Sequence, residues 1–403
     1  MLIQNSIPDA TRSNGLDVFR DFLPRAGRNY AERRNFDLGP SERDNVSVLS
    51  PFIRHRLVLE SEVLKQVVAT HSRETADKFI QEVFWRAYFK GWLEQHPSVW
   101  HDYRREVNAN IATLESDADA CAAYDRAVSG ATGIDCFDAW VEELVRTGYL
   151  HNHARMWFAS IWIFTLELPW QLGADFFLRN LLDGDPASNT LSWRWVGGLH
   201  TRGKTYLARL SNITSYTNDR FNPVGQLAAT APPLSESATH ERMPLPEADR
   251  ADIDGPFGLL VTEEDCVGQP LPVEGEPKAV IGLSATSLRS PLAVSQGATA
   301  FAADAVRDGA MRAAESAGRE AEFSESSLWD DDLLEFAKRH DLRKIVTAYA
   351  PIGPVAEQLD RAATRLAESG VQLRRVRRGY DERAWPYAAN GYFKLKARIP
   401  DLL

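Results

Sequence analysis

The sequence predicts a mostly α-helical domain followed by an α/β domain built on a parallel sheet. Apolar residues recur with a helical period through the first 226 residues, where the alternation typical of strands is scarce. From residue 256 onward, short apolar runs alternate with helical stretches, which favours parallel strands covered by helices in a Rossmann-like arrangement. A chain of 403 residues has room for two to three domains.

Several segments of the first part have the spacing of amphipathic helices. In residues 16–33, an apolar side chain recurs at Leu16, Phe19, Phe22 and Leu23. Similar patterns predict helices over residues 61–70, 74–96, 135–147, 152–166 and 174–182. We expect these segments to form one helical domain over residues 1–226.

Residues 227–255 are rich in Pro, Ser and acidic residues, which indicates an exposed linker before an α/β domain over residues 256–403. The strands of this second domain are predicted at residues 257–261, 279–283, 344–348 and 371–376. Its helices are predicted at residues 300–317, 331–340 and 355–369. It contains no GxGxxG motif and no Walker lysine loop, so a phosphate cradle of those kinds has no support.

The composition is that of a globular protein, with 44% hydrophobic and 25% charged residues. The net charge of -10 argues against a generally basic nucleic-acid coat and still allows a local basic groove. Residues 1–230 carry 25 Lys and Arg against 28 Asp and Glu, so we expect this less acidic part to meet any polyanion. The sequence shows no signal-peptide pattern and no apolar run of 18 residues, which predicts a soluble, cytoplasmic protein.

Metal and disulfide chemistry have little support in the sequence. Cys121, Cys136 and Cys266 lie too far apart for a disulfide framework, a cysteine-only metal site or an iron–sulfur cluster. His151 and His153 could suggest a metal, but no acidic or cysteine partner lies near them in the sequence. We therefore expect no metal site.

Tryptophan is crowded into one region, because nine of the 11 tryptophans fall between Trp85 and Trp195. Indole rings most often fill a hydrophobic core. Such crowding also suits a base-stacking surface or a chain of redox-active rings.

The first cluster of polar residues begins at Asp183 and Asp185. Asp185 before Pro186 is typical of a helix start, with Asp at the N-cap and Pro in the first turn. Asn189 and Trp193 are four residues apart and share a face of that helix. The alternative is an ordinary cap followed by a core tryptophan.

The second cluster places Asn152, Arg155 and Met156 on one helix face. A buried arginine needs an anion, and Asp183 is the candidate. The alternative is a surface Arg155 with Asn152 as a helix cap.

The third cluster, Glu82, Trp85 and Arg86, combines an acceptor, a flat ring and a guanidinium, which together can hold a nucleobase. Read locally, a solvated Glu–Arg pair beside a core tryptophan is the competing interpretation. A fourth cluster follows Tyr30 and consists of hydroxyl and backbone groups before a Pro-initiated helix, which can hold phosphates: Val46, Ser47, Val48, Leu49 and Ser50.

Together these clusters resemble one family. The phrases RNYAERRNFDL, SVLSPFIRHRLV, FIQEVFWRAYFKGWL, TGIDCFDAWVEELVRTGYLHNHARM and LLDGDPASNTLSWRWVGG make residues 16–222 similar to the FAD-binding domain of the DNA photolyase and cryptochrome family. The resemblance covers about half of the chain. It implies a photolyase-type helical domain that binds FAD.

The resemblance also implies which residues hold FAD. Its pyrophosphate and ribityl region would lie against Tyr30 and the stretch from Val46 to Ser50, with Arg86 nearby. Asn152 and Arg155 would flank the isoalloxazine, with Arg155 paired to Asp183.

Three residues near the flavin ring have implied roles of their own. Asp185 would accept a hydrogen bond from the flavin imide or a sugar, and Asn189 would face flavin N5. Trp193 would be the proximal electron donor and Trp170 the next indole of the relay. The family's third tryptophan maps near Asp117 and is missing here, which leaves other rings to complete the relay: Trp100, Tyr103 or Trp157.

The resemblance implies damaged DNA as the partner and repair of cyclobutane pyrimidine dimers by blue light as the function. The lesion would lie against Glu82, Trp85, Asn152, Met156 and Trp195, and Glu82 would stabilise the lesion's radical anion. Candidate phosphate contacts are Arg33, Arg34, His153, Arg194, Arg202 and Lys204.

A blue-light photoreceptor without repair activity is the alternative function. The net charge of -10 and the unusual segment after Trp195 favour it, whereas the five lesion-site matches favour repair. A light-independent flavin oxidoreductase has little support, because no nicotinamide fingerprint accompanies the flavin site. The resting redox state of the flavin, a second antenna chromophore and the oligomeric state stay open.

The second half resembles the α/β antenna domain of the same family, in the phrases FGLLVTEEDC, AVIGLSA and NGYFKLKARIPDLL among others. In the family this domain precedes the FAD domain, so the order here suggests a circular permutation. The family's arginine-rich phrase after the first strand is replaced by residues 262–265, TEED. This change argues against the usual antenna pigment and the usual contact between domains.

Overall fold

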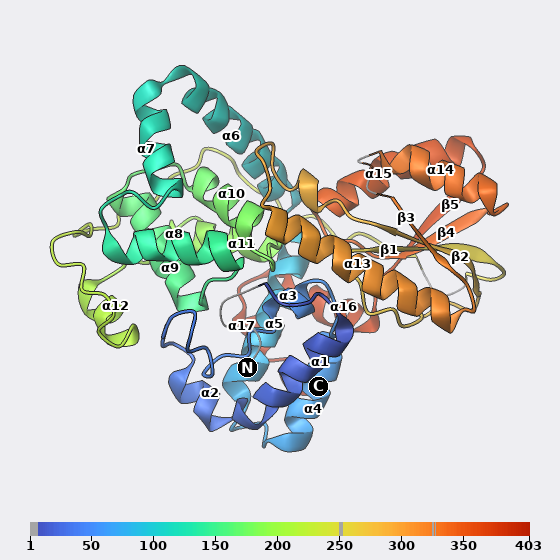
Figure 1. Ribbon diagram of the computed structural model, residues 1–403, viewed down its shortest axis with the longest axis horizontal. Helices are drawn as coiled ribbons and strands as arrows, with labels where there is room; N and C mark the ends of the chain where they lie inside the picture. The colour runs from blue at the N-terminus through green and yellow to red at the C-terminus, as the bar shows by residue number, and fades with distance from the viewer. Residues whose placement is uncertain (1–6, 250–252, 325, 327) are drawn as a thin grey trace.

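The computed structural model describes residues 7–249, 253–324, 326 and 328–403. Figure 1 shows a helical part, coloured blue to green, beside a parallel sheet with its covering helices. A helical half followed by an α/β half is the fold class that the sequence predicts.

Twelve α-helices and two short helical turns precede the first described strand. They are α1 (Arg12–Phe22), η1 (Leu23–Arg25), α2 (Arg28–Arg33), α3 (Ser50–Arg54), α4 (Glu60–Thr70), α5 (Asp77–Glu94), α6 (Pro97–Ser116), α7 (Ala118–Val128), α8 (Asp135–Thr147), α9 (Asn152–Ser160), η2 (Ile161–Thr165), α10 (Trp170–Asn180), α11 (Pro186–Val196) and α12 (Leu210–Tyr216).

The predicted helix over residues 16–33 is divided into three pieces. Pro24 stands in the first turn of η1, and Gly27 precedes α2 with a non-helical backbone. Proline lacks the amide hydrogen that a continuous helix needs, and glycine loses more conformational entropy in a helix than other residues do. The apolar period alone therefore predicted one helix where the chain forms three. Helices α6 and α7 were not predicted; only four residues of α6 and two of α7 are buried, so each presents a narrow apolar face to the core.

The α/β part has five parallel strands in the order β3-β2-β1-β4-β5. The strands are β1 (Phe257–Thr262), β2 (Pro277–Leu283), β3 (Ala321–Phe323), β4 (Lys344–Ala348) and β5 (Gln372–Val376). The helices among them are η3 (Thr286–Leu288), α13 (Gln296–Ser316), α14 (Trp329–Arg339) and α15 (Pro354–Glu368).

Successive residues of β2 show that both faces of the sheet are covered. Val280 packs with Ala310 and Ala314 of α13, whereas Ile281 packs in the cluster that contains α14 and α15. This alternation is expected because neighbouring side chains on a strand point to opposite faces. In Figure 1, α13 accordingly lies on one side of the sheet and the α14–α15 pair on the other.

The segment between the two parts contains the predicted linker and is held at several points. Leu234 and Met243 donate backbone hydrogen bonds to the helical part, at Gly197 and Gln95. Near its end, the Asp249 amide donates to the carbonyl of Arg375 in β5. Many of its residues are exposed, as predicted, yet its path is fixed by these contacts.

The loop after β1 joins the two parts through buried ion pairs. The Glu264 carboxylate lies 2.6 Å from Nη2 of Arg54 and 3.3 Å from Nζ of Lys90. Asp265 lies 3.7 Å from Nη1 of Arg56 in the helical part, whereas its pair with Arg378 and the Glu263 bond to the Ala285 amide stay within the α/β part. Residues 262–265, whose acidic sequence argued against the usual contact between domains, therefore themselves form a contact between the helical and α/β parts.

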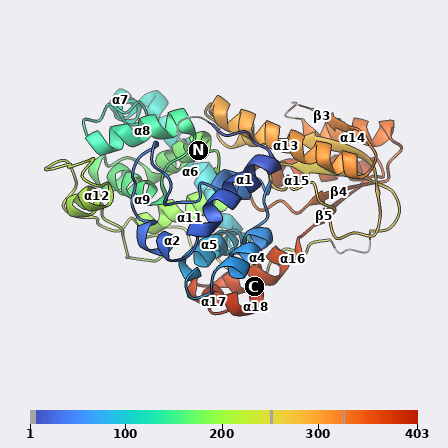
Figure 2. The same cartoon turned by 60° about the horizontal axis from the view of Figure 1, so that its bottom comes forward.

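The chain ends in a set of short helices: α16 (Gly379–Ala384), η4 (Trp385–Ala389), α17 (Phe393–Lys396) and α18 (Ile399–Leu402). Although the predicted α/β domain includes these residues, they pack against α4 and α5 of the helical part, as Figure 2 shows. A Cβ on Gly91 of α5 would lie 2.9 Å from Trp385 and Ala388, so α5 and η4 are in close contact.

Among the described residues, no helix has both the length and the apolar character that crossing a membrane requires.

Candidate functional site

The site is assembled around the start of α11. Asp185 is the N-cap of α11, and its carboxylate accepts hydrogen bonds from Ser188 N (3.1 Å) and Ser188 Oγ (2.8 Å). Pro186 follows at the first helical position, so the predicted cap is confirmed. Burial alone would raise the pKa of Asp185, but the cations Lys90 and Arg54 outweigh burial and hold that pKa below its usual range.

Asn189 and Trp193 follow on α11, as predicted. The Asn189 side chain is 8% exposed and donates from Nδ2 to the Ala174 carbonyl at 2.7 Å, which fixes its amide plane. Trp193 is 2% exposed, and its Nε1 has no hydrogen-bond partner among the residues that the structure describes.

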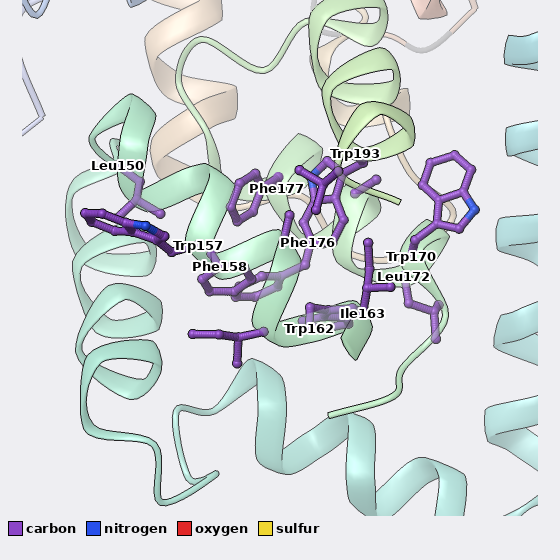
Figure 3. Packing of buried hydrophobic residues seen from close by; sticks show 14 of the residues in the cluster. Leu150, Trp157, Phe158, Trp162, Ile163, Trp170, Leu172, Phe176, Phe177 and Trp193 are labelled. Carbon is purple, nitrogen blue, oxygen red and sulfur yellow. The ribbon is translucent and has the colours of Figure 1, made fainter. Parts of the chain in front are cut away.

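Aromatic rings surround Trp193, as Figure 3 shows. Its ring centroid lies 5.2 Å from that of Phe177, 6.1 Å from Trp162 and 6.4 Å from Phe158. Gly173 makes this packing possible, because a Cβ there would come within 2.3 Å of the Trp193 ring. The indole is therefore held in one orientation by close packing.

Arg155 and Asp183 form the predicted pair. Nη2 of Arg155 donates to both carboxylate oxygens of Asp183, at 3.1 and 3.0 Å. Nε of Arg155 donates to the Leu150 carbonyl at 2.9 Å, which fixes the guanidinium from a second side. Asn152 is exposed at the first position of α9, and Met156 is half-buried one turn later.

The predicted phosphate-binding residues include buried donors without partners. Ser50 begins α3, and its Oγ has no hydrogen-bond partner in the described ranges. The same holds for Nε and Nη2 of Arg86 on α5. Buried polar groups are normally satisfied, so unpaired donors indicate a site for an acceptor such as a phosphate oxygen. The residues therefore fit the pyrophosphate of FAD.

The loop before α3 has an unusual backbone. Val48 has a φ of 51°, a value that a β-branched residue rarely adopts. Ser47 Oγ accepts from the Leu49 amide at 3.3 Å, and the Val46 amide donates to Arg43. Strained backbone of this kind is often found at ligand sites.

Tyr30 lies near this loop in sequence but is enclosed by other rings. Its ring is 5.2 Å from that of Phe79 and 5.8 Å from Phe22, both edge-on. Burial raises its pKa well above the usual range, so the phenol stays protonated.

On α5, the predicted stacking ring Trp85 already has a partner. Tyr392, which precedes α17, stacks on Trp85 with a centroid distance of 3.6 Å and an interplanar angle of 10°. The Tyr392 hydroxyl donates to the Gln81 carbonyl at 3.0 Å and fixes this position. A base could therefore stack on Trp85 only from its other face.

Glu82 lies one turn before Arg86, and its side chain is 41% exposed. Its surroundings limit hydration and raise the pKa of Glu82, whereas Arg34, at 3.9 Å, opposes this shift. A carboxyl with a raised pKa can carry a proton and donate a hydrogen bond. The solvated ion pair that the sequence suggested between Glu82 and Arg86 is therefore not formed.

Trp195 lies apart from the stacked rings of Trp85 and Tyr392. It is 36% exposed on α11 and is tilted against Tyr206, with ring centroids 5.7 Å apart. No ring contact between Trp195 and Trp85 is found within the described part of the chain.

The rings around Trp193 include a tryptophan that was not predicted as part of the relay. Trp162 makes the tryptophan–tryptophan contact with Trp193, and sequence reasoning did not single it out. Trp170 contacts Tyr103 at 5.8 Å, and Tyr103 contacts Trp100 at 5.3 Å. Two of the rings proposed to complete the relay are therefore in line with Trp170.

The remaining candidate, Trp157, belongs to a separate stack with Trp140 and His153, at centroid distances of 5.5 and 4.1 Å. Figure 3 shows Trp157 at the left of the view, away from Trp193 and the rings that surround it. His151 and His153, the two histidines that could suggest a metal in the sequence, both make hydrogen bonds within the protein. His153 Nδ1 contacts the Asn35 carbonyl at 2.9 Å, and the side chain of His151 accepts from the His153 amide.

One group of charged residues was missed. Arg54, Lys90 and Glu264 gather beside Asp185, with Lys90 Nζ 4.0 Å from an Asp185 oxygen. Burial would raise the pKa of Glu264, but Arg54 and Lys90 lower it to about 2. The spacing of Lys90, four residues after Arg86 on α5, was a usable signal, whereas nothing in the sequence pointed to Glu264.

One predicted phosphate contact is wrong. Arg194 is 5% exposed and forms a two-pronged pair with Glu236, at 2.7 Å for each bond, so it cannot reach a DNA backbone. Arg202 and Lys204 are exposed, Arg33 is 42% exposed, and Arg34 donates to the Ala31 carbonyl.

Comparison with known proteins agrees with this site. Residues 79–236 match the model of the FAD binding domain of DNA photolyase. A deoxyribodipyrimidine photo-lyase of Streptomyces griseus is 34% identical over 222 residues, which are 53% of this chain and 46% of that protein. One from Agrobacterium fabrum is 29% identical over 46% of this chain and 38% of the relative.

A crystal structure of a bacterial class III photolyase from Agrobacterium tumefaciens aligns with 52% of this chain and 43% of that one, at 25% identity and a TM-score of 0.44. The chain spans less than half the length of the two curated relatives described above. The matched region begins inside α5 and ends beyond α11, so it includes Glu82, the Arg155–Asp183 pair and Trp193. Over residues 79–236, the chain is therefore similar to the FAD-binding domain of DNA photolyases.

Proposed function

We propose that this protein uses blue light and reduced FAD to split cyclobutane pyrimidine dimers in DNA. The observation that carries the proposal is the arrangement on α11, where the Asn189 amide and the caged Trp193 ring follow the capped Asp185. The Arg155–Asp183 pair lies beside this helix start. Curated relatives that carry the name deoxyribodipyrimidine photo-lyase support the choice of reaction.

In this proposal the chain's own residues hold and orient FAD. Ser50 Oγ and the Arg86 guanidinium donate to the pyrophosphate, which would satisfy donors that are otherwise unpaired. Asp185 remains ionised because of its cationic neighbours, so it is an acceptor for an N–H or O–H group of the cofactor. Bound and reduced FAD supplies the excited electron that the dimer receives.

On the substrate side, Glu82 and Trp85 receive the flipped lesion. A protonated Glu82 donates a hydrogen bond to a pyrimidine carbonyl, and this bond strengthens as negative charge develops on the lesion. Flipping costs a few kcal/mol, and stacking on an aromatic ring returns about 1–3 kcal/mol per base. In this proposal the face of Trp85 that Tyr392 does not cover offsets much of the cost of extrusion.

Re-reduction of an oxidised cofactor would begin at Trp193. Trp162 is in edge-to-face contact with Trp193, at 6.1 Å, and a second row of rings runs from Trp170 through Tyr103 to Trp100. We assign the first transfer to Trp193 and leave these two rows as the competing onward routes.

A photoreceptor without repair activity is the second candidate, and the Tyr392–Trp85 stack favours it. One face of the predicted stacking ring is already covered, and the charged neighbour of Glu82 is Arg34 from the same chain. Under this reading the C-terminal helices would occupy the substrate side and respond to the redox state of the flavin.

A repair assay separates the two functions. Purified protein with reduced FAD is illuminated with blue light in the presence of a dimer-containing oligonucleotide, and restored thymines are counted. We expect repair by the wild type and a strong loss in Glu82→Ala, since Glu82 touches the lesion. Glu142→Ala is the matched control, because Glu142 is exposed on α8, and it should repair normally. If the flavin is photoreduced normally but no dimer is repaired, the photoreceptor is the function that remains.

A further inference from the structure

The C-terminal residues 383–400, called here the basic strap, have a charge unlike that of the rest of the chain. The strap contains Arg383, Lys394, Lys396 and Arg398 and no acidic residue, in a protein whose net charge is -10. Three of these four side chains belong to exposed residues, and Lys396 is half-buried. The strap is therefore a local positive surface on an acidic protein.

The strap is firmly attached to α5. Trp385, Leu395 and Ile399 are buried in the same hydrophobic cluster as Phe84 and Tyr88 of α5. Tyr392 adds the stack on Trp85 and the hydrogen bond to Gln81. The positive surface is thus held beside the ring that is proposed to receive the lesion, and Figure 2 shows α17 next to α5.

The strap also presents apolar rings to solvent. Phe393 is 79% exposed, the highest value among the exposed large hydrophobic residues described, and it directly follows the buried Tyr392. Tyr387 is 39% exposed, and Arg398 lies 5.4 Å from its ring centroid. The strap therefore combines exposed aromatic surface with its cations.

Two of the cations are available for a ligand. Lys394 and Lys396 form no ion pair with any residue that the structure describes, whereas Arg398 is paired with Asp401 at 3.4 Å. An exposed ring followed by two free lysines matches the chemistry of a single nucleic-acid strand, whose bases stack and whose phosphates attract cations.

We propose that the basic strap is part of the DNA-binding surface, with Phe393 stacking on a base next to the flipped lesion and Lys394 and Lys396 contacting phosphates. This inference rests on the proposed function, because it takes DNA as the partner. It adds a surface outside the first 230 residues, where the charge balance predicts that a polyanion would bind. The overall charge of residues 231–403 hid the strap, because acidic residues elsewhere in that half outnumber its cations.

The test measures binding of a fluorescent, dimer-free single-stranded oligonucleotide to the full-length FAD protein at several salt concentrations. The variants are Phe393→Ala and the double variant Lys394→Ala/Lys396→Ala. Met311→Ala is the matched control for the ring, because Met311 is 57% exposed on α13. Lys278→Ala/Lys338→Ala is the control for charge, because both lysines are exposed on the α/β part. Flavin absorbance checks that each variant is folded.

We expect Phe393→Ala to weaken binding about tenfold at constant salt, as the loss of one base stack predicts. The lysine double variant should reduce the slope of log K against log salt by about 1.4, that is, about 0.7 for each lost phosphate contact with a single strand. Both controls should bind like the wild type. Wild-type binding that neither strap variant changes would overturn this inference alone. A wild type that neither binds DNA nor repairs dimers would overturn the proposed function and the inference with it.

Discussion

At the scale of single residues, the environment of Trp193 limits how it can act. The indole is caged by rings, and the space next to Gly173 is already filled. Its nitrogen lacks a partner in the described residues, so loss of a proton from the ring would not be assisted by a neighbouring base. Trp193 is therefore suited to donating an electron rather than a proton.

We expect Trp193→Phe to slow light-driven reduction of the bound flavin by on the order of tenfold or more, since the proximal donor is removed while an aromatic ring still fills the cage. Transient absorption after a laser flash measures this rate. Trp329→Phe is the control, because Trp329 is a buried indole on α14. Equal rates in the wild type and Trp193→Phe would place the donor elsewhere.

The second residue-scale prediction concerns the pH dependence of repair. Glu82 has a raised pKa, and the proposed hydrogen bond needs its protonated form. The repair yield per absorbed photon should therefore be highest below this pKa and fall as the pH rises through it. The glutamine side chain in the Glu82→Gln variant is a hydrogen-bond donor at every pH, so the repair yield of that variant should not change with pH.

Yield profiles measured with a dimer-containing oligonucleotide check this prediction. A wild-type yield that rises with pH would mean that the ionised carboxylate is the active form.

At the scale of elements, the loop after β1 is a structural link whose strength depends on acid. Glu264 is fully enclosed between Arg54 and Lys90, and removal of one partner from a buried ion cluster leaves uncompensated charge. The pKa of Glu264 is about 2, below the ordinary value of 4.5. Its contribution to stability is therefore complete above the unfolded-state pKa and is lost as the pH falls from there toward 2.

We expect Glu264→Gln to lower the free energy of unfolding at neutral pH by about 3 kcal/mol, because two cations lose their main anion. Urea unfolding at pH 7 and at pH 3 measures the effect, and the difference between variant and wild type should be smaller at pH 3. Glu274→Gln, at an exposed position between β1 and β2, should match the wild type at both pH values. A variant deficit that grows at low pH would contradict the assigned role.

The elements also show where sequence patterns suffice. The predicted helix over residues 135–147 coincides with α8, because a strong apolar stripe and Gly148 in a left-handed conformation define its course and its end. Asp185 defined the start of α11 in the same way. The Trp162–Trp193 contact was not predicted, since it depends on how η2 and α11 pack, and no local pattern encodes that.

At the scale of the whole molecule, buried contacts join the helical and α/β parts in two places. The loop after β1 enters the helical part with its carboxylates, and the C-terminal helices that follow β5 cover α4 and α5. The predicted order of the parts agrees with the structure, whereas the C-terminal packing could not be read from the sequence, because its short helices lack a periodic pattern. The circular permutation stays a prediction.

These contacts predict cooperative unfolding. Far-UV circular dichroism, which follows all helices, and the release of bound FAD, which follows the helical part, should change at the same urea concentration. The physical reason is that neither part can open without exposing the buried ion pairs and the apolar face of α5. Two separate transitions would show that the parts unfold independently.

The stack between Trp85 and Tyr392 joins two positions that lie far apart in the sequence. A replacement at either one leaves its partner with an apolar ring face in water, so tolerated changes at these positions should arise in pairs. Descendants of this protein that lose the tyrosine ought to replace the tryptophan as well, or to recruit another ring for the vacated face. Covariation between these two positions, measured in an alignment of many related sequences, would then record the history of this contact.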